Sequence, residues 1–267
     1  MTTTSLFISD LHLHPERPES MRLFEDFIAN KGSDADQLFI LGDLFEYWLG
    51  DDASEHCGYQ PVIDSLSTLA GMNTKVFFMH GNRDFLVGTR FASLIGGSVL
   101  PDPTKFRLGG QGVLLMHGDS LCTDDIEHQK FRELTRSREW QQNILSKSIA
   151  EREEIARQFR MNSMKGNAKK AEAIMDVNQQ AVESVMLEQQ VKLLIHGHTH
   201  RAAIHNFQLA GETMHRIVLG DWYTQGSYLV HDLNGFRLMD YPADRLCAEL
   251  KLESSNADDA SLLSHQA

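Results

Sequence analysis

Five short apolar runs in this chain each end in residues of a type that binds metal ions. The runs lie at 5–8, 38–41, 76–79, 113–116 and 193–195, and runs of this length bounded by Gly or Asp are typical of buried strands. Because ligands gather at the carboxyl ends of strands in an open α/β sheet, we expect a metal site there. Seven candidate ligands favour a site for two metals, and in chain order they are Asp10, His12, Asp43, Asn82, His117, His198 and His200.

Composition limits the class of protein. At 267 residues, 42% of them hydrophobic, the chain is long enough for one large globular domain or two small ones. No apolar stretch approaches the roughly 20 residues of a membrane span, and we expect no signal peptide before the first run. Cys57, Cys122 and Cys247 are too few and too scattered for a disulfide framework or a thiolate metal site. We therefore expect a cytoplasmic protein, and the net charge of −12 argues against a nucleic-acid binder.

The segment 126–190 differs from the rest of the chain in both charge and periodicity. It carries 11 Lys/Arg and 10 Asp/Glu, a net of +1, which leaves −13 on the remaining residues. Either its helices have ordinary mixed-sign solvated faces, or this block approaches an anionic partner. Upstream, apolar runs alternate with helical patterns, such as the face formed by Met21, Phe24 and Phe27 and the helix opened by Pro61.

No strand signal appears within 126–190, and the strand pattern returns after His200 at 217–219, 227–230 and 236–239. Apolar residues from Trp140 to Phe159 fit one or two amphipathic helices, and those at 174–185 fit another. We expect the sequence Asn-Ser-Met-Lys-Gly-Asn at 162–167 to break the helical pattern. The chain is thus expected to form a single domain over residues 1–252 with a helical insertion at about 126–190. A polar, disordered tail is expected at 253–267.

The order of the ligand motifs resembles that of the calcineurin-like metallophosphoesterases. These motifs are Asp-x-His, Gly-Asp, Gly-Asn-x-Asp, a lone His-Gly and Gly-His-x-His, and the resemblance covers roughly residues 5–232. It implies an α/β fold, a layered β-sandwich flanked by helices. Carboxylate, amide and imidazole ligands suit Mn²⁺, Fe²⁺ or Zn²⁺. The resemblance further implies that Asp10, His12, Asp43 and His200 hold one metal, and that Asp43, Asn82, His117 and His198 hold the other, with Asp43 bridging.

Arg83 departs from the pattern of that family. Most members have His at this position, where it is thought to protonate the leaving group. Arginine remains charged near neutral pH and cannot act as a general acid. An alkoxide leaving group needs a proton, whereas a phosphate leaving group, with a second pKa of about 6, does not. Arg83 therefore favours cleavage of a pyrophosphate, in which a cation offsets developing charge.

Longer motifs resemble the family of UDP-2,3-diacylglucosamine hydrolases of lipid A biosynthesis. They lie at 81–85, 117–125, 160–163 and 174–178, so the resemblance includes the insertion. It implies that two Mn²⁺ ions support attack of water on the α-phosphorus, giving UMP and 2,3-diacylglucosamine 1-phosphate. It also implies a peripheral location on the cytoplasmic face of the bacterial inner membrane. Catalytic roles would fall on Asn82 and Arg83, and substrate contacts on Asn82, Arg83, Asp125, Ser163, Asn167, Lys170 and His198.

Several residues keep a second interpretation. Asp125 is either a substrate contact or a helix N-cap. Asp221 follows another apolar run but is not needed to complete the metal site. The apolar stripes of the insertion form either its own core or a groove for acyl chains. Six basic residues of the insertion are candidates for contact with an anionic membrane, namely Arg152, Arg157, Arg160, Lys165, Lys169 and Lys170.

Two other functions stay open. The same metal site would serve an enzyme that acts on a soluble dinucleoside polyphosphate, a cyclic nucleotide or a phosphoprotein, although Arg83 and the apolar insertion argue against it. The other alternative is a binding scaffold that keeps the fold without catalysis. Such a scaffold would be expected to lose metal ligands, and all seven are present here.

Overall fold

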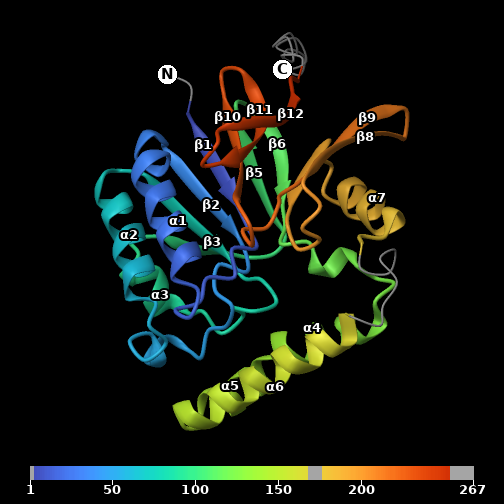
Figure 1. Cartoon of the computed structure of the whole chain (residues 1–267). Coiled ribbons are helices and arrows are strands. Elements are labelled where there is room, and N and C mark those ends of the chain that lie inside the picture. The colour runs from blue at the N-terminus through green and yellow to red at the C-terminus, as the bar shows by residue number, and fades with distance from the viewer. Residues whose placement is uncertain (1–2, 168–175, 253–267) are drawn as a thin grey trace, which may run out of the picture.

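Two β-sheets pack face to face, and helices cover their outer faces (Figure 1). The computed structural model describes residues 3–167 and 176–252. These layers confirm the expected α/β class, a β-sandwich flanked by helices. Within the described ranges, no helix has the length and apolar character needed to cross a membrane. The tail expected at 253–267 lies outside the described residues.

The larger sheet contains the first three of the five apolar runs. Its strand order is β12-β11-β10-β1-β2-β3-β4. Strands β1 to β4 are parallel, and β1 also pairs antiparallel with β10. The bounds are β1 (Ser5–Ile8), β2 (Gln37–Leu41), β3 (Lys75–Met79), β4 (Ser98–Leu100), β10 (Gly226–Asp232), β11 (Gly235–Tyr241) and β12 (Arg245–Leu250).

The smaller sheet contains the other two runs. Its order is β5-β6-β7-β9-β8, in which β6, β7 and β9 are parallel and both edge strands are antiparallel to their neighbours. The five runs therefore divide between two sheets and do not share one open sheet. Strands buried on both faces look alike in sequence whichever sheet they join. The bounds are β5 (Thr104–Leu108), β6 (Gln111–Leu115), β7 (Leu193–His196), β8 (Ala203–Leu209) and β9 (Glu212–Val218).

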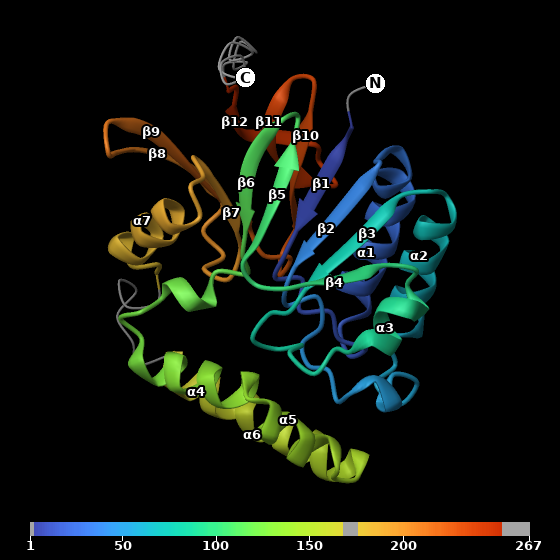
Figure 2. The same ribbon diagram turned by 180° about the vertical axis from the view of Figure 1, so that it is seen from behind.

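The helices form three groups. The first group, α1 to α3, covers the outer face of the larger sheet, and α7 covers the outer face of the smaller sheet. Helices α4 to α6 lie beyond the sheets in both views (Figures 1 and 2). We call α4 to α6 the cap. The bounds are α1 (Pro18–Asn30), α2 (Gln60–Gly71), α3 (Thr89–Leu94), α4 (Ile126–Arg136), α5 (Arg138–Leu145), α6 (Ile149–Asn167) and α7 (Gln179–Glu188).

Side chains of the central strands alternate between two cores. Leu6 and Ile8 of β1 join the core beneath the first group of helices, which includes Phe27 of α1. Phe7 points to the other face, between the sheets, and stacks on Phe39 of β2 with 4.7 Å between ring centroids. Burial on both faces explains why the strand reads as a continuous apolar run. A rigid pair of sheets therefore supports the loops that follow β1, β2, β3, β6 and β7.

The expected break at 162–167 is wrong, because α6 runs without interruption from Ile149 to Asn167. Gly within a helix costs only about 1 kcal/mol relative to Ala. Tertiary contacts near the C-terminal part of α6 oppose that cost. The ring of Phe159 packs against Phe131 of α4, with 5.1 Å between centroids, and Arg160 pairs with Glu46 of the sandwich.

Four strands, β4, β5, β8 and β12, had no counterpart among the sequence predictions. All four lie at the edges of their sheets. Their side chains are mostly half-buried or exposed, as the pattern of β8 illustrates. An edge strand with one or two wet faces carries no continuous apolar run, so the signal used for the central strands does not detect it.

Candidate metal centre and adjoining cavity

The seven predicted ligands lie together at the carboxyl ends of their strands. The loop after β1 carries Asp10 and His12, and the loop after β2 carries Asp43. Asn82 follows β3, and the remaining three ligands follow β6 and β7. Both sheets thus contribute to one cluster. The side chains that it brings together are Asp10, His12, Asp43, Asn82, His117, His198 and His200.

One half of the cluster contains Asp10, His12 and His200. Ligand atoms of these three residues lie within 4.8 Å of one another. The Nε2 atoms of His12 and His200 are 3.4 Å apart, and Asp10 Oδ1 is 3.4 Å from His200 Nε2. Asp10 Oδ1 is buried and has no hydrogen-bond partner among the described residues. Such a convergence of donor atoms fits a cation.

The other half is built around Asn82. Its Oδ1 lies 3.0 Å from His117 Nε2 and 2.9 Å from His198 Nδ1. Asp43 Oδ2 is 3.9 Å from His117 Nε2 and also 3.9 Å from His12 Nε2. One carboxylate oxygen therefore faces both halves, as expected for a bridging ligand. Asp10 also comes within reach of Asp43, as expected for two ligands of one metal, and of His117, which the resemblance assigned to the other metal.

Neighbouring groups fix the orientation of the ligands. His117 donates from Nδ1 to the Leu41 carbonyl oxygen at 2.8 Å, so that its Nε2, once deprotonated, presents a lone pair to the cluster. Asp10 Oδ2 accepts from Ser9 Oγ at 2.6 Å and from the backbone N–H of His198 at 2.8 Å. These bonds leave Oδ1 as the atom of Asp10 that faces the cluster.

Electrostatics couple the carboxylates to the imidazoles. Burial alone would lower the pKa of His200, but Asp10 and Asp221 raise it to about 10. Burial likewise opposes protonation of His117, while Asp43 and Asp119 raise its pKa to about 9. Burial raises the pKa of Asp43 to about 7, against the attraction of His117. Metal binding at neutral pH therefore has to displace protons from these rings.

Five of the seven ligands adopt the left-handed backbone region. The φ angles are 56° for Asp10, 48° for His12, 52° for Asp43, 67° for His198 and 58° for His200. Non-glycine residues seldom occupy this region, and such strain concentrates at functional sites. The neighbouring backbone is equally constrained. A Cβ at position 81 would lie 2.0 Å from an oxygen of the Asp43 carboxylate, which explains the glycine there.

Three residues that support the site were given no role by the sequence, or only an open one. Buried Asp84 accepts backbone N–H groups of Leu44 and Gly81, each at 2.8 Å, and so ties the loops after β2 and β3 together. Asp221 Oδ2 lies 3.4 Å from His200 Nδ1, so Asp221 contacts a ligand. Tyr223 stacks on His12 with 5.3 Å between ring centroids. The only sequence signal for Asp84 is its place in the Gly-Asn-x-Asp motif.

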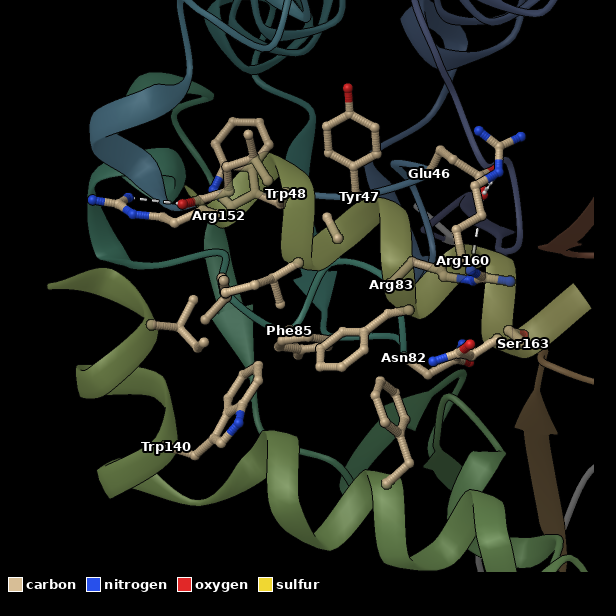
Figure 3. Close-up of a pocket in the computed structure, with 18 of the residues that line it drawn as sticks. Glu46, Tyr47, Trp48, Asn82, Arg83, Phe85, Trp140, Arg152, Arg160 and Ser163 are labelled. Carbon is tan, nitrogen blue, oxygen red and sulfur yellow. Dashed lines mark hydrogen bonds and ion pairs between the residues drawn. The ribbon is translucent and has the colours of Figure 1, made fainter. Parts of the chain in front are cut away.

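An apolar cavity of about 460 Å³ opens next to the cluster, between the cap and the sandwich (Figure 3). Asn82 and Arg83 line one end of it, near Ser163 of α6. Aromatic and aliphatic side chains such as Trp140 and Phe85 line most of the rest, together with charged residues that include Glu46 and Arg160. The apolar stripes of the cap therefore face a cavity as well as packing with one another. The further apolar lining residues include Leu86, Phe131, Ile144, Ile155 and Phe159.

The predicted substrate contacts are only partly described. Arg83 and Ser163 line both the apolar cavity and a smaller polar cavity of about 250 Å³, which also contains Asp125, His198 and His200. Asp125 caps α4 by accepting the backbone N–H of His128 at 3.1 Å. It thus acts as an N-cap while facing the polar cavity. Asn167 ends α6 with a side chain outside the described part, and Lys170 lies outside the described residues.

Ion pairs hold the cap against the sandwich at both ends. Arg132 Nε of α4 lies 3.0 Å from the buried carboxylate of Asp119, and Arg136 donates to the Gly81 carbonyl oxygen at 2.9 Å. At the far end, Arg152 binds both carboxylate oxygens of Asp52 at 2.7 and 2.8 Å. The cap is thus fixed relative to the metal cluster.

Three of the six basic residues considered for membrane contact are engaged within the protein. Arg152 pairs with Asp52, Arg157 with Glu154, and Arg160 with Glu46. The side chains of Lys165, Lys169 and Lys170 lie outside the described part of the chain.

Comparison with known proteins agrees with this geometry. The calcineurin-like phosphoesterase family model matches residues 3–202. A UDP-2,3-diacylglucosamine hydrolase of Chromohalobacter salexigens is 52% identical over 219 residues, 82% of this chain and 89% of the relative. One of Xanthomonas campestris pv. campestris is 46% identical over 242 residues, 88% of this chain and 98% of the relative.

Among solved structures, Yfce, a phosphoesterase from E. coli, aligns with a TM-score of 0.46 at 16% identity, covering 92% of this chain and 98% of that one. The match to the family model includes the strands that precede the candidate ligands and the cap, and the two relatives each align with more than four fifths of the chain. The chain therefore belongs to the calcineurin-like phosphoesterases and, within them, to the UDP-2,3-diacylglucosamine hydrolase family.

Proposed function

We propose that this protein hydrolyses the pyrophosphate bond of UDP-2,3-diacylglucosamine in lipid A biosynthesis, releasing UMP and 2,3-diacylglucosamine 1-phosphate. The observation that carries the proposal is that the cluster of candidate metal ligands directly adjoins the apolar cavity. Asn82 belongs to the metal cluster through His117 and His198, and it also lines the apolar cavity beneath the cap. A substrate with a charged pyrophosphate and two acyl chains requires both environments side by side.

The cluster fits two Mn²⁺ ions per subunit. Mixed carboxylate, amide and imidazole donors suit this metal. In one half, the buried Asp10 Oδ1, which lacks a hydrogen-bond partner among the described residues, and the close Nε2 atoms of His12 and His200 support a cation. In the other half, the support is Asn82 Oδ1, which lies within 3.0 Å of a ring nitrogen of His117 and of His198. When bound, two such metals supply Lewis acidity and an activated water for attack on the α-phosphorus. Asp10, His12, Asp43 and His200 would hold one ion, and Asp43, Asn82, His117 and His198 the other.

Arg83 has the properties needed to stabilise a phosphate as the leaving group. Its backbone N–H donates to Asp43 Oδ1 at 2.8 Å, which fixes it beside the bridging carboxylate. Its guanidinium lines both cavities and remains charged near neutral pH, so it offsets charge that develops on the leaving phosphate without donating a proton. Asn82, Asp125, Ser163, Asn167, Lys170 and His198 are proposed to contact the substrate along with it.

The apolar cavity favours the lipid substrate over a soluble nucleotide or a phosphoprotein. Burial of an acyl chain yields about 0.8 kcal/mol per CH₂ group, and the aromatic lining between α4, α5 and α6 offers a surface for such burial. A substrate that resides in a bilayer requires the enzyme to work at its surface. We therefore place the protein peripherally on the cytoplasmic face of the inner membrane.

The test is mass-spectrometric detection of UMP released from UDP-2,3-diacylglucosamine, with and without Mn²⁺. Turnover is expected only with the metal. In ¹⁸O-labelled water the label is expected in UMP, since attack occurs at the α-phosphorus. Label in the sugar phosphate would place the attack on the other phosphorus and contradict the mechanism. Absence of UMP release by metal-loaded protein would contradict the proposed substrate.

A further inference from the structure

Glu46 lies at the centre of three arginines drawn from separate parts of the chain. Its Oε2 accepts from Arg17 Nη2 at 3.2 Å, and its Oε1 lies 3.2 Å from Arg160 Nε and 3.9 Å from Arg83 Nη1. Arg17 precedes α1, Arg83 belongs to the loop after β3, and Arg160 belongs to α6 of the cap. Figure 3 shows Glu46 and Arg160 at the end of the cavity where Arg83 and Asn82 also lie.

The charges of this group do not balance. One carboxylate faces three guanidinium groups, so the four side chains carry a net charge of +2. The Glu46 side chain is 5% exposed, while those of Arg83 and Arg160 are 21% and 41% exposed and line the cavity. Glu46 is thus the buried partner of the group, and Arg83 and Arg160 place positive charge that Glu46 does not neutralise at the wall of the cavity. Guanidinium pairs of this kind bind phosphate oxygens.

The backbone of Glu46 is also fixed. Its N–H donates to the Leu13 carbonyl oxygen at 3.0 Å, next to the parallel bridge between Leu13 and Phe45. Arg17 extends the connection to the metal loop, because it also donates to the His12 carbonyl oxygen. A rigid carboxylate therefore joins the loop of one metal ligand, the loop of Asn82 and Arg83, and a cap helix.

We propose that Glu46 is a positioning residue that holds Arg83 and Arg160 as a paired seat for the phosphate of the leaving sugar phosphate. Each phosphate of a UDP-sugar carries one negative charge near neutral pH, and hydrolysis turns the leaving phosphate into a monoester with a second pKa of about 6. Glu46 and its three arginines together have a surplus of two positive charges, which matches the total charge of about −2 that the leaving phosphate reaches as a monoester. The inference rests on the proposed function, since it names how the same site accommodates that product.

The experiment compares Glu46→Gln, which removes the charge but keeps the shape, with Asp52→Asn. The control variant weakens another ion pair between the cap and the sandwich, at the far end. For UDP-2,3-diacylglucosamine, Glu46→Gln is expected to lower kcat by about tenfold or more, with KM nearly unchanged, because the arginines stabilise charge that develops during the reaction. Asp52→Asn is expected to raise KM and leave kcat nearly unchanged. Hydrolysis of bis(4-nitrophenyl) phosphate, whose leaving group carries no phosphate, is expected to be preserved in both.

A second measurement does not depend on the lipid. Glucose 1-phosphate, a soluble counterpart of the leaving group, is expected to inhibit the diester reaction of the unaltered protein and to inhibit Glu46→Gln about tenfold less. Weaker inhibition of Glu46→Gln in a protein that leaves the lipid intact would refute the proposed function and uphold the phosphate seat.

Three results would overturn the seat. The first is that Glu46→Gln and Asp52→Asn change kcat and KM equally. The second is that Glu46→Gln loses diester hydrolysis or bound metal. The third is that glucose 1-phosphate inhibits Glu46→Gln as strongly as it inhibits the unaltered protein. Should Glu46→Gln fold poorly, Glu46→Asp keeps the charge one methylene further back and is expected to show the same pattern with a smaller loss of kcat.

Discussion

At the scale of single residues, Asp43 is the candidate ligand whose carboxylate faces both halves of the cluster. Asp43→Ala is expected to abolish turnover and to reduce the bound metal of both halves, because each loses an anionic ligand. Asn82→Ala removes one neutral oxygen and is expected to lose less metal. Metal content by mass spectrometry and UMP release test this, with exposed Asp64→Ala of α2 as the folded control. Full metal content and substantial turnover in Asp43→Ala would contradict the two-metal assignment.

The histidine ligands predict proton release on metal binding. In the metal-free protein the pKa of His117 is raised to about 9 and that of His200 to about 10, so both rings are protonated at pH 7. Metal requires neutral rings and an ionised Asp43, so filling the cluster at pH 7 is expected to release about one proton from each ring and about half a proton from Asp43, whose pKa is raised to about 7. Metal affinity is expected to rise with pH until the pH exceeds the pKa values of both rings. Calorimetry in buffers of different ionisation enthalpy measures this release, and binding without release at pH 7 would contradict it.

Residues with a fixed chemical task were predictable from the sequence, and residues that only support them were not. The seven ligands stand out because metal-binding residue types follow apolar runs, and the structure brings all seven together. Asp84 and Glu46 contact residues distant in the chain, Leu44 in one case and three arginines in the other. No local pattern encodes such partners, so these roles emerge only from the folded chain.

At the scale of elements, burial decided which parts were predictable. Central strands such as β1 and β7 are buried on both faces and read as continuous apolar runs. Edge strands such as β8, with exposed positions along their length, carry no such signal. The predicted break at 162–167 was wrong because contacts with other elements, which no local pattern shows, stabilise the helix there. Contacts of Phe159 and Arg160 with other elements support α6 where its own sequence is a weak helix former.

Helix α6 has one face toward the cavity and one toward solvent, which allows a matched test. Ile155→Asn places a polar group in the cavity and is expected to raise KM for the long-chain substrate about tenfold, with a smaller rise for a short-chain analogue. Arg157→Gln alters the exposed face of the same helix and is expected to change neither. Steady-state kinetics with both substrates test this. Equal rises for both chain lengths would show that the cap supports the fold and does not bind the acyl chains.

At the scale of the whole molecule, membrane contact is expected to depend on apolar residues more than on charge. The chain has a net charge of −12, and three candidate basic residues are paired internally. Ile126 and Leu134 of α4 are 58% and 49% exposed. Replacing both by Ser is expected to reduce cosedimentation with lipid vesicles. The control is Leu233→Ser, at an exposed leucine in the turn between β10 and β11.

The contribution of charge to membrane contact is measured by changing salt. Raising it from about 0.1 to 0.5 M shortens the Debye length and weakens electrostatic attraction. Vesicle binding of the unaltered protein is expected to change little over this range. A steep loss with salt, together with no effect of the double Ser variant, would favour an electrostatic contact.

The order of strands has a consequence for synthesis on the ribosome. Strand β1 lies between β2 and β10, and β10 begins only at Gly226, after all strands of the smaller sheet have been made. Until then the nascent chain exposes one edge of β1, whose residues are all buried in the finished protein. Unpaired apolar edges of this kind promote association between chains. The last candidate ligands, His198 and His200, are also synthesised after the other five, so the cluster is complete only once they have emerged from the ribosome.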